Sequence, residues 1–312
     1  MDPPSHSAPP VGRATRLLWE SLRTVTGLGC TPLRPFADVL ASLSPDSFVR
    51  VGDRLVHVEQ AGSGEAVLLV HGFGGSTYSW RKVVPALAAG FHVVAVDLAG
   101  FGWSERPKGR GTYTLSGQED LILGVADALA IDRFHLVGHS YGGGISLWIA
   151  TRHGARLRSL TLVDSTLPAY AVSRRRGYAA VRLLVALFVR AVALRPPFVR
   201  RSLERSVFDR AVVTDELVDA YVARLAVEGA VDAYRGLTAP VRGPVPQVDL
   251  TALRLPTMII WGSQDRLLPL LWGERAANAI PGAQLVVIER CGHLPMEEQP
   301  EVFATALQHF LA

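Results

Sequence analysis

The 312-residue chain has few cysteines and almost no lysine. Its two cysteines, Cys30 and Cys291, lie far apart and show none of the paired spacings of a zinc site or a redox motif, so we expect two free thiols. Lysine occurs only at positions 82 and 108. Basic and acidic residues number 32 and 28, and a net charge of +4 dispersed along the chain gives no reason to expect a nucleic-acid partner.

Long apolar runs are also missing. No uninterrupted apolar run of signal-peptide length stands near the N-terminus, which leaves secretion unsupported and favours the cytoplasm. The most apolar stretch, residues 179–194, is interrupted by Arg182 and Arg190 and is followed by two prolines, so a transmembrane helix is not favoured there. The chain lacks a Walker lysine followed by serine or threonine, and it lacks the dinucleotide glycine spacing, which argues against nucleotide binding.

The chain does have 49% hydrophobic and 19% charged residues, as expected of a globular protein with an ample core. Residues 1–46 form an N-terminal extension, whose first ten residues are rich in proline and serine and should be disordered. A short amphipathic helix is expected after Arg13, because Leu17, Leu18, Ser21, Leu22 and Val25 stand at suitable spacings. Trp19 and the leucines are the residues that could reach a membrane surface. This segment either packs against the body of the protein or an oligomer partner, or it makes a peripheral membrane contact.

Beyond residue 46, short β-rich runs alternate with helical patterns, as in an α/β sheet. The runs from Val67 onward are almost continuously apolar, which is typical of parallel strands covered by helices on both faces. We therefore expect an α/β fold with a doubly wound, mostly parallel eight-stranded sheet and an active site at the carboxyl ends of its strands. The predicted strands are Phe48–Val51, Leu55–Glu59, Val67–Val70, His92–Val96, Phe134–Val137, Leu160–Val163, Thr257–Trp261 and Gln284–Ile288, and the predicted helices are Tyr78–Ala89, Ser116–Ala130, Gly142–His153, Leu270–Ala279 and Pro300–Phe310.

One apolar strand runs through Gly138-His139-Ser140-Tyr141-Gly142 into a helical pattern. Glycines on both sides permit a sharp, strained turn that pushes the Ser140 hydroxyl outward, as in a nucleophile elbow. The N–H of Tyr141, at the start of the helix, would face a developing oxyanion. Glycines and serines also make ordinary turns, so the hypothesis needs further support.

A second glycine-rich turn, His71-Gly72-Phe73-Gly74-Gly75, follows the apolar strand that ends at Val70. Its backbone amides are not shielded by bulky side chains and can face a ligand. In an elbow enzyme the second oxyanion-hole donor comes from this loop, so we assign it to the N–H of Phe73. The alternative is an ordinary glycine turn.

A serine becomes a good nucleophile when an imidazole takes its proton and a carboxylate orients that imidazole. The chain order in this architecture is serine, acid, histidine. Asp265 follows one predicted strand and His293 follows the next, so both loops open on the edge where Ser140 emerges. His71 and His139 flank the two glycine-rich elements and are expected to shape them.

Two other aspartates stand at strand ends. Asp164 could orient the same imidazole from the neighbouring loop and remains the alternative to Asp265. Asp97 precedes a glycine-rich turn, whose backbone N–H groups such a carboxylate can accept, so we interpret it as structural.

Together these motifs resemble those of the α/β-hydrolase superfamily, from about Phe48 to Leu311. The chain is most similar to the capped branch, which includes carboxylesterases, C–C hydrolases of meta-cleavage products, haloperoxidase-like enzymes, epoxide hydrolases and haloalkane dehalogenases. Epoxide hydrolases and dehalogenases of this fold attack with an aspartate at the elbow, so Ser140 argues against both. The motifs are His71-Gly72-Phe73-Gly74-Gly75, Asp97-x-x-Gly100-x-Gly102-x-Ser104, Gly138-His139-Ser140-Tyr141-Gly142-Gly143, Gly262-x-x-Asp265 and Gly292-His293.

The resemblance implies a Ser140–His293–Asp265 triad and a helical cap inserted after the sixth strand. Residues 166–250 fit the cap, which leaves 47–165 and 251–312 as the core. The cap region holds 13 arginines against 8 acidic residues. Solvated helix faces explain most of these arginines, although some could engage a substrate carboxylate. The apolar stretch 179–194, including Phe188, either covers a pocket above Ser140 or packs the cap onto the core.

The first expectation for function is a serine hydrolase that cleaves carboxylic esters with apolar acyl or aryl groups through an acyl-enzyme. This chemistry requires no metal and no organic cofactor, and its partner is a small hydrophobic ester. A C–C bond hydrolase of meta-cleavage products is an alternative that uses the same triad. Two further alternatives are a cofactor-free haloperoxidase or perhydrolase and a non-catalytic binding protein with the hydrolase fold.

Overall fold

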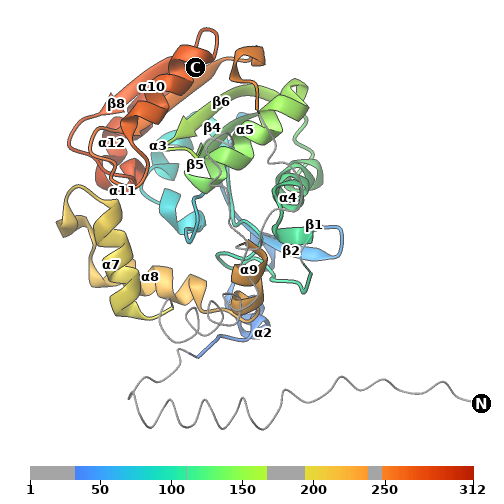
Figure 1. Cartoon of the computed structure of the whole chain (residues 1–312). Helices are drawn as coiled ribbons and strands as arrows, with labels where there is room; N and C mark the ends of the chain where they lie inside the picture. The colour runs from blue at the N-terminus through green and yellow to red at the C-terminus, as the bar shows by residue number, and fades with distance from the viewer. Residues whose placement is uncertain (1–31, 110, 167–193, 238–247) are drawn as a thin grey trace, which may run out of the picture.

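The computed structural model describes residues 32–109, 111–166, 194–237 and 248–312, which are built on one eight-stranded sheet (Figure 1). The strand order is β1-β2-β4-β3-β5-β6-β7-β8. The β1–β2 and β2–β4 pairs are antiparallel and the others are parallel, so the mostly parallel eight-stranded sheet is confirmed. The strands are β1 (Phe48–Val51), β2 (Arg54–Ala61), β3 (Glu65–Val70), β4 (Phe91–Val96), β5 (Phe134–His139), β6 (Leu157–Val163), β7 (Thr257–Gly262) and β8 (Gln284–Ile288).

Helices flank the sheet, as the alternating pattern predicted (Figure 1). Helix α3 (Val84–Leu87) packs with α12 (Pro300–Leu311), where Gln308 Nε2 donates to the carbonyl of Ala86 at 2.7 Å. Helix α4 (Leu115–Ala128) packs with α5 (Tyr141–His153). The other described helices outside residues 194–237 are α2 (Phe36–Ser42), α10 (Leu270–Ala279), α11 (Pro295–Glu298) and the short 3₁₀ helices η1 (Pro45–Ser47), η2 (Thr77–Trp80), η3 (Gly111–Tyr113), η4 (Gly154–Arg156) and η8 (Leu250–Ala252).

The hydrophobic core surrounds the central strands. Every residue of β5 and β7 is buried, and so is every residue of β3 after the first. Burial of both faces explains why these strands are mostly apolar instead of alternating, with His135 and His139 of β5 held by hydrogen bonds. The largest fully buried side chains include Trp80, Trp261, Phe101, Phe134 and Phe303. This rigid centre fixes where each strand ends and therefore where the following loops begin.

The single helix predicted over Tyr78–Ala89 is wrong. The structure has η2 and α3 instead, with a turn at 81–83 between them. Pro85 explains the break, because proline donates no backbone hydrogen bond and its ring excludes a preceding helical turn. Proline is tolerated only at the start of a helix, which is where α3 places it.

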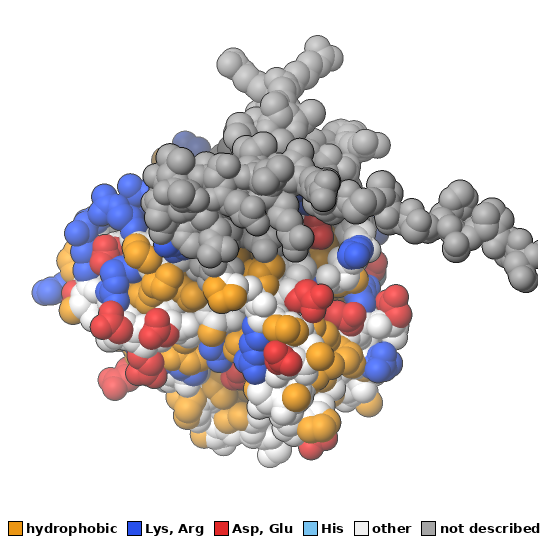
Figure 2. Space-filling view, turned by 90° about the horizontal axis from the view of Figure 1, so that it is seen from below, with side chains coloured by type: hydrophobic (Ala, Val, Ile, Leu, Met, Phe, Trp, Pro, Cys, Tyr) orange, Lys and Arg blue, Asp and Glu red, His pale blue; other side chains and the backbone are white. Residues whose placement is uncertain are grey.

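Between β6 and β7 the structure describes residues 194–237, which we call the insertion. It contains α7 (Pro196–Ser206), η7 (Arg210–Val212), α8 (Asp215–Leu225) and α9 (Ala230–Leu237), all of which lie outside the sheet (Figure 1). Seven arginines and seven acidic residues balance each other here, so the arginine excess of the predicted cap falls outside the insertion. Figure 2 shows basic, acidic and hydrophobic side chains interleaved on the described part of this face. The cap boundaries at 166 and 250 stay predictions.

Residues 32–46 pack beside the insertion. The backbone N–H of Arg34 donates to Ala226, and the N–H of Glu228 donates to the carbonyl of Arg34, both at 2.8 Å. The predicted amphipathic helix with Leu17 and Trp19, together with Cys30, Phe188 and the apolar stretch as far as residue 193, lies outside the described residues. Within the described residues, every helix is too short or too polar to cross a bilayer.

Candidate functional site

Ser140 occupies the sharp turn between β5 and α5. Its backbone has a φ of 52° and a ψ of −115°, in the left-handed region that side chains rarely adopt. The chain packs tightly here: a Cβ on Gly138 would lie 2.3 Å from Ser146 Oγ, and one on Gly142 would lie 2.4 Å from the carbonyl of His71. Glycine is therefore required on both sides, and the strained turn predicted from the sequence is present.

A row of hydrogen bonds joins Ser140, His293 and Asp265. His293 Nε2 lies 2.9 Å from Ser140 Oγ, and His293 Nδ1 lies 2.6 Å from Asp265 Oδ2. The other carboxylate oxygen of Asp265 accepts the backbone N–H groups of Leu267 and Leu268 at 2.7 and 3.0 Å. These contacts fix the carboxylate, which in turn favours the imidazole tautomer with its proton on Nδ1 and leaves Nε2 free to accept the serine proton.

The three side chains come from three loops at the carboxyl edge of the sheet. Ser140 follows β5, Asp265 follows β7 and His293 follows β8. The last two loops pack so closely that a Cβ on Gly262 would lie 1.9 Å from the carbonyl of Gly292. The structure thus brings together the residues that chain order assigned to serine, acid and histidine.

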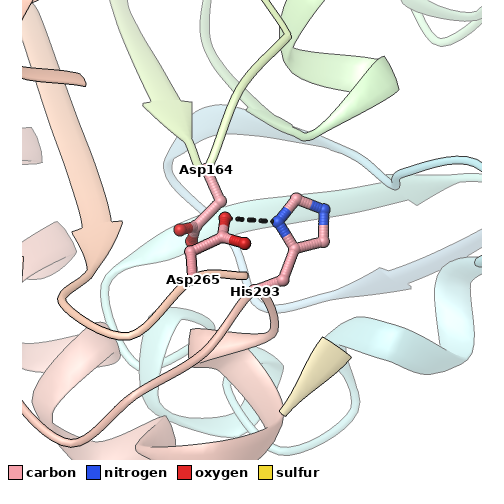
Figure 3. Close-up of side chains that lie close together, drawn as sticks. All are labelled: Asp164, Asp265 and His293. Carbon is pink, nitrogen blue, oxygen red and sulfur yellow. Dashed lines mark hydrogen bonds and ion pairs between the residues drawn. The ribbon is translucent and has the colours of Figure 1, made fainter. Parts of the chain in front are cut away.

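Asp164 lies beside this row but does not bond His293. One carboxylate oxygen each from Asp164 and Asp265 and one ring nitrogen of His293 lie within 4.8 Å of one another. Figure 3 shows the three side chains close together. Asp164 Oδ1 accepts the N–H of Gly262 at 2.9 Å, and Oδ2 has no hydrogen-bond partner among the described residues. Burial raises the pKa of Asp164 well above its usual range, and the charge of Asp265 raises it further. Its burial beside a second carboxyl group therefore disfavours the charged form of Asp164.

Two carboxylates and an imidazole this close together are also residue types that can ligate a metal ion. Their geometry favours the hydrogen-bonded row instead, because His293 Nδ1 lies at hydrogen-bond distance, 2.6 Å, from Asp265 Oδ2, and burial raises the pKa of Asp164, which disfavours its charged form. A metal would need all three groups deprotonated and their lone pairs free.

His139, next to the elbow, supports the histidine loop. Its ring lies 4.8 Å from that of His293, and its Nε2 lies 2.8 Å from the carbonyl oxygen of His293. Burial lowers the pKa of His139 well below its usual value, and nearby His293 lowers it further. A neutral His139 that donates from Nε2 ties the two loops together, as a shaping role requires.

The turn from His71 to Gly75 passes directly over the elbow. A Cβ on Gly72 would lie 3.0 Å from the Cβ of Ser140. Gly75 donates its N–H to the carbonyl of Gly72 at 3.0 Å and closes the turn. Within the described residues, the backbone N–H groups of Phe73 and Tyr141 donate to no other backbone carbonyl. Two unused donors beside Ser140 fit an oxyanion hole, although their role stays a prediction.

Aromatic side chains surround the approach to Ser140. Phe73 is 49% exposed, and its ring contacts those of Phe101, Tyr141 and Tyr234 at centroid distances of 5.1, 6.2 and 5.5 Å. Tyr234 belongs to α9, so the insertion contributes directly to this surface. Burial raises the pKa of Tyr141 and of Tyr234 to about 12, which keeps both phenols uncharged. The surface is suited to an apolar substrate group.

Asp97 has the structural contacts expected of it. Its carboxylate accepts the backbone N–H groups of Thr77 and Trp103 at 2.6 and 2.8 Å and lies 2.8 Å from His57 Nδ1. Burial alone would raise the pKa of Asp97, but the interactions with His57 and these donors outweigh it and lower the value to about 2. The charged carboxylate organises its loop.

A cavity of about 550 Å³ lies elsewhere, lined by Arg133, Leu157, Asp249 and Pro256 among others. Leu157 begins β6 and Pro256 precedes β7, so the cavity lies at the amino edge of the sheet. Ser140 stands at the opposite edge, and we therefore assign the chemistry to the hydrogen-bonded row and not to the cavity.

The sequence interpretation missed Glu298, at the end of α11. Its carboxylate accepts backbone N–H groups from the histidine loop and from the insertion. Nothing in the local pattern marks it, because acidic residues are common in the first turn of a helix. Only the folded arrangement of distant segments identifies its partners.

Comparison with known proteins gives a family and several relatives. The model of the Alpha/beta hydrolase family matches residues 67–306. The chain is 33% identical to 2-hydroxymuconate semialdehyde hydrolase of Pseudomonas sp. (strain CF600) over 267 residues, which cover 82% of this chain and 90% of that protein. A meta-cleavage product hydrolase structure from Pseudomonas fluorescens IP01 matches with 28% identity and a TM-score of 0.71, covering 85% of this chain and 96% of that one. An esterase structure from Thermogutta terrifontis matches with 28% identity and a TM-score of 0.70, covering 85% and 97%.

Proposed function

The chain belongs to the alpha/beta hydrolase family, and from this premise we propose that it is a serine hydrolase in which Ser140 attacks a substrate carbonyl. The observation that supports this most strongly is the row from Ser140 through His293 to Asp265, with heavy-atom distances of 2.9 and 2.6 Å. Three residue types that generate a nucleophile meet at hydrogen-bond distance although they are far apart in the chain.

In the proposed mechanism, Ser140 Oγ adds to the carbonyl carbon while His293 Nε2 takes its proton. The new oxyanion lies against the N–H groups of Phe73 and Tyr141, where the loss of one donor typically costs about 3 kcal/mol. His293 then gives its proton to the leaving group. A water molecule, deprotonated by His293, hydrolyses the acyl-enzyme and restores Ser140. Asp265 remains ionised and stabilises the imidazolium at each step.

For the bond that is cleaved, we propose a C–C bond in a meta-cleavage type product as the first candidate. The relative from Pseudomonas sp. bears the name of such a hydrolase, and it is similar to this chain over most of both lengths. The apolar surface of Phe73, Tyr141 and Tyr234, with the buried Phe101 packed behind Phe73, would accept the part of the substrate next to the attacked carbonyl. This candidate replaces the ester hydrolysis that the sequence placed first.

Ester hydrolysis is the second candidate. The esterase structure from Thermogutta terrifontis has the same 28% identity as the meta-cleavage product hydrolase structure and nearly the same TM-score, 0.70 against 0.71. The same nucleophile and the same acyl-enzyme would serve an ester, with an alcohol in place of a carbon leaving group.

The test is a direct competition between the two substrate classes. Purified protein would be assayed with 2-hydroxy-6-oxo-6-phenylhexa-2,4-dienoate and with p-nitrophenyl esters of graded acyl length, beside a Ser140→Ala control. Turnover of the dienoate with little ester activity supports the first candidate, and the reverse supports the second. Peracid formation from acetate and peroxide would indicate a perhydrolase. Failure of a fluorophosphonate to label Ser140 in folded protein would contradict the proposal and favour a non-catalytic binding protein.

A further inference from the structure

Glu298 connects two segments that the chain keeps far apart. Its Oε2 accepts the backbone N–H of Phe208 at 2.6 Å and that of Asp209 at 3.2 Å, both from the insertion. Its Oε1 accepts the N–H of Gly292 at 2.8 Å, and Cys291 Sγ lies 3.8 Å away. One carboxylate therefore collects donors from the insertion and from the loop that carries His293.

The same two segments also touch through their backbones. The N–H of His293 donates to the carbonyl of Ser206 at 2.6 Å. A Cβ on Gly292 would lie 2.6 Å from that same oxygen and 2.8 Å from the backbone nitrogen of Phe208. Position 292 thus needs a residue without a side chain, because the insertion occupies the space.

His293 is consequently fixed from several directions. The insertion holds its backbone N–H, His139 lies against its carbonyl, and the ring spans Ser140 and Asp265. Three further contacts accompany this backbone hydrogen bond: the Glu298 carboxylate, the close approach at Gly292, and the Arg290 guanidinium, which lies 5.9 Å from the centre of the Phe208 ring. A shift of the insertion would therefore move the imidazole.

We propose that Glu298 is a positioning residue that joins residues 206–209 of the insertion to residues 291–293, so that the alignment of His293 on Ser140 depends on the seating of the insertion. This inference rests on the proposed function of Ser140 and His293. Substrate that contacts the insertion, for example at Tyr234, would then affect how well His293 is aligned with Ser140. Burial raises the pKa of Glu298 above its usual value, as expected for a carboxylate held away from water between two segments.

Glu298→Gln tests the connection between residues 206–209 and 291–293 while keeping the size of the side chain. The glutamine amide has one oxygen and one NH₂ group. Either the N–H groups of Phe208 and Asp209 or the N–H of Gly292 must therefore face a donor instead of an acceptor. We expect the rate of Ser140 labelling by a fluorophosphonate, and kcat on p-nitrophenyl butyrate, to fall by about 10² or less, the scale of a 1 Å misplacement near the chemistry, with KM nearly unchanged.

Glu297→Gln is the matched control. Glu297 is also buried and immediately precedes Glu298, but it pairs with Arg81 and Lys82 and not with the histidine loop. Its loss should lower the melting temperature and leave the labelling rate unchanged. If Glu298 only stabilises the fold, Glu298→Gln should likewise lower the melting temperature and leave the labelling rate unchanged.

Gly292→Ala tests the same connection from the histidine loop. Its added methyl group would displace Ser206 and Phe208 without removing the Glu298 carboxylate. We expect the same loss of labelling rate, and this variant decides the question if Glu298→Gln does not fold. Folded Glu298→Gln or Gly292→Ala protein that is labelled at the wild-type rate would overturn the proposal. Wild-type protein that is not labelled at all would instead overturn the proposed function.

Discussion

The sheet carries a row of serine, histidine and carboxylate at each of its two edges. At the carboxyl edge the row is Ser140, His293 and Asp265. At the amino edge, His135 Nδ1 lies 2.8 Å from Ser159 Oγ and His135 Nε2 lies 3.2 Å from Glu65 Oε2. By composition and hydrogen-bond distance alone the two rows are nearly equivalent.

Their surroundings differ in every respect that catalysis requires. Ser159 and His135 are opposite each other in the register of β6 and β5, so their backbones belong to the sheet and offer no free N–H groups to an oxyanion. Ser159 is only 3% exposed, whereas Ser140 is half-buried at the start of a helix. Glu65 is half exposed and also pairs with Arg158, whereas the side chain of Asp265 is fully buried. A serine, a histidine and an acid in a row are thus not sufficient for a catalytic site.

Replacing each serine gives the largest expected contrast. Ser140→Ala should lower kcat by about 10⁶-fold, the scale found when a protease loses its serine nucleophile. Ser159→Ala should leave kcat unchanged, because its hydroxyl is buried at the amino edge of the sheet, away from Ser140. Steady-state kinetics on the substrate that the panel identifies would measure both. Equal effects would show that we have assigned the nucleophile wrongly.

Replacing each acid gives the next contrast. Asp265→Asn should keep the fold but lower kcat by roughly 10⁴-fold, because an amide favours the wrong imidazole tautomer. Glu65→Gln should have no effect on kcat, since water already solvates half of that side chain. Kinetics together with circular dichroism would separate loss of function from loss of structure. A similar loss in both variants would contradict the comparison.

Asp164→Asn sharpens the comparison within the first row. Asparagine keeps the oxygen that accepts the N–H of Gly262, and it carries no charge at a site where burial raises the pKa of Asp164. We therefore expect kcat to fall by less than about 10-fold, far less than for Asp265→Asn. If Asp164→Asn loses activity on the larger scale while Asp265→Asn does not, the acid is Asp164.

The smallest expected effect concerns stability and pH in the second row. Burial lowers the pKa of His135 below its ordinary value of 6.5, although Glu65 partly opposes this. As pH falls below 6.5, the unfolded chain binds a proton there that the folded chain resists, so the free energy of unfolding decreases. Urea unfolding at about pH 7.5 and about pH 5.5 should show a weaker pH dependence for His135→Gln than for the wild type. Part of the dependence should remain, because burial also lowers the pKa of His71 and His139. If His135→Gln shows the same pH dependence of the free energy of unfolding as the wild type, His135 does not contribute to that dependence.

The sheet and the positions of Ser140, Asp265 and His293 could be predicted because local patterns determine them. Apolar runs mark buried parallel strands, and the loops after such strands share one edge. The helix predicted at Tyr78–Ala89 failed because its periodicity was given more weight than Pro85.

The contacts of Glu298 and the raised pKa of Asp164 could not be predicted from the sequence. Both depend on distances between segments that are remote in the chain: Phe208 and Gly292 for Glu298, and Asp265 for Asp164. Similarly, only the structure shows that the second row exists, because neither Ser159 nor Glu65 belongs to a recognisable motif.

The left-handed backbone of Ser140 also bears on how such a protein evolves. A conformation that every L-residue resists is favoured at this position while a nucleophilic side chain is useful there, since glycine would adopt the same turn without penalty. Once selection for turnover ends, mutation to glycine at the elbow is the change that relaxes the turn. Glycine at this place in a relative would therefore be the signature of a hydrolase lineage that has abandoned catalysis.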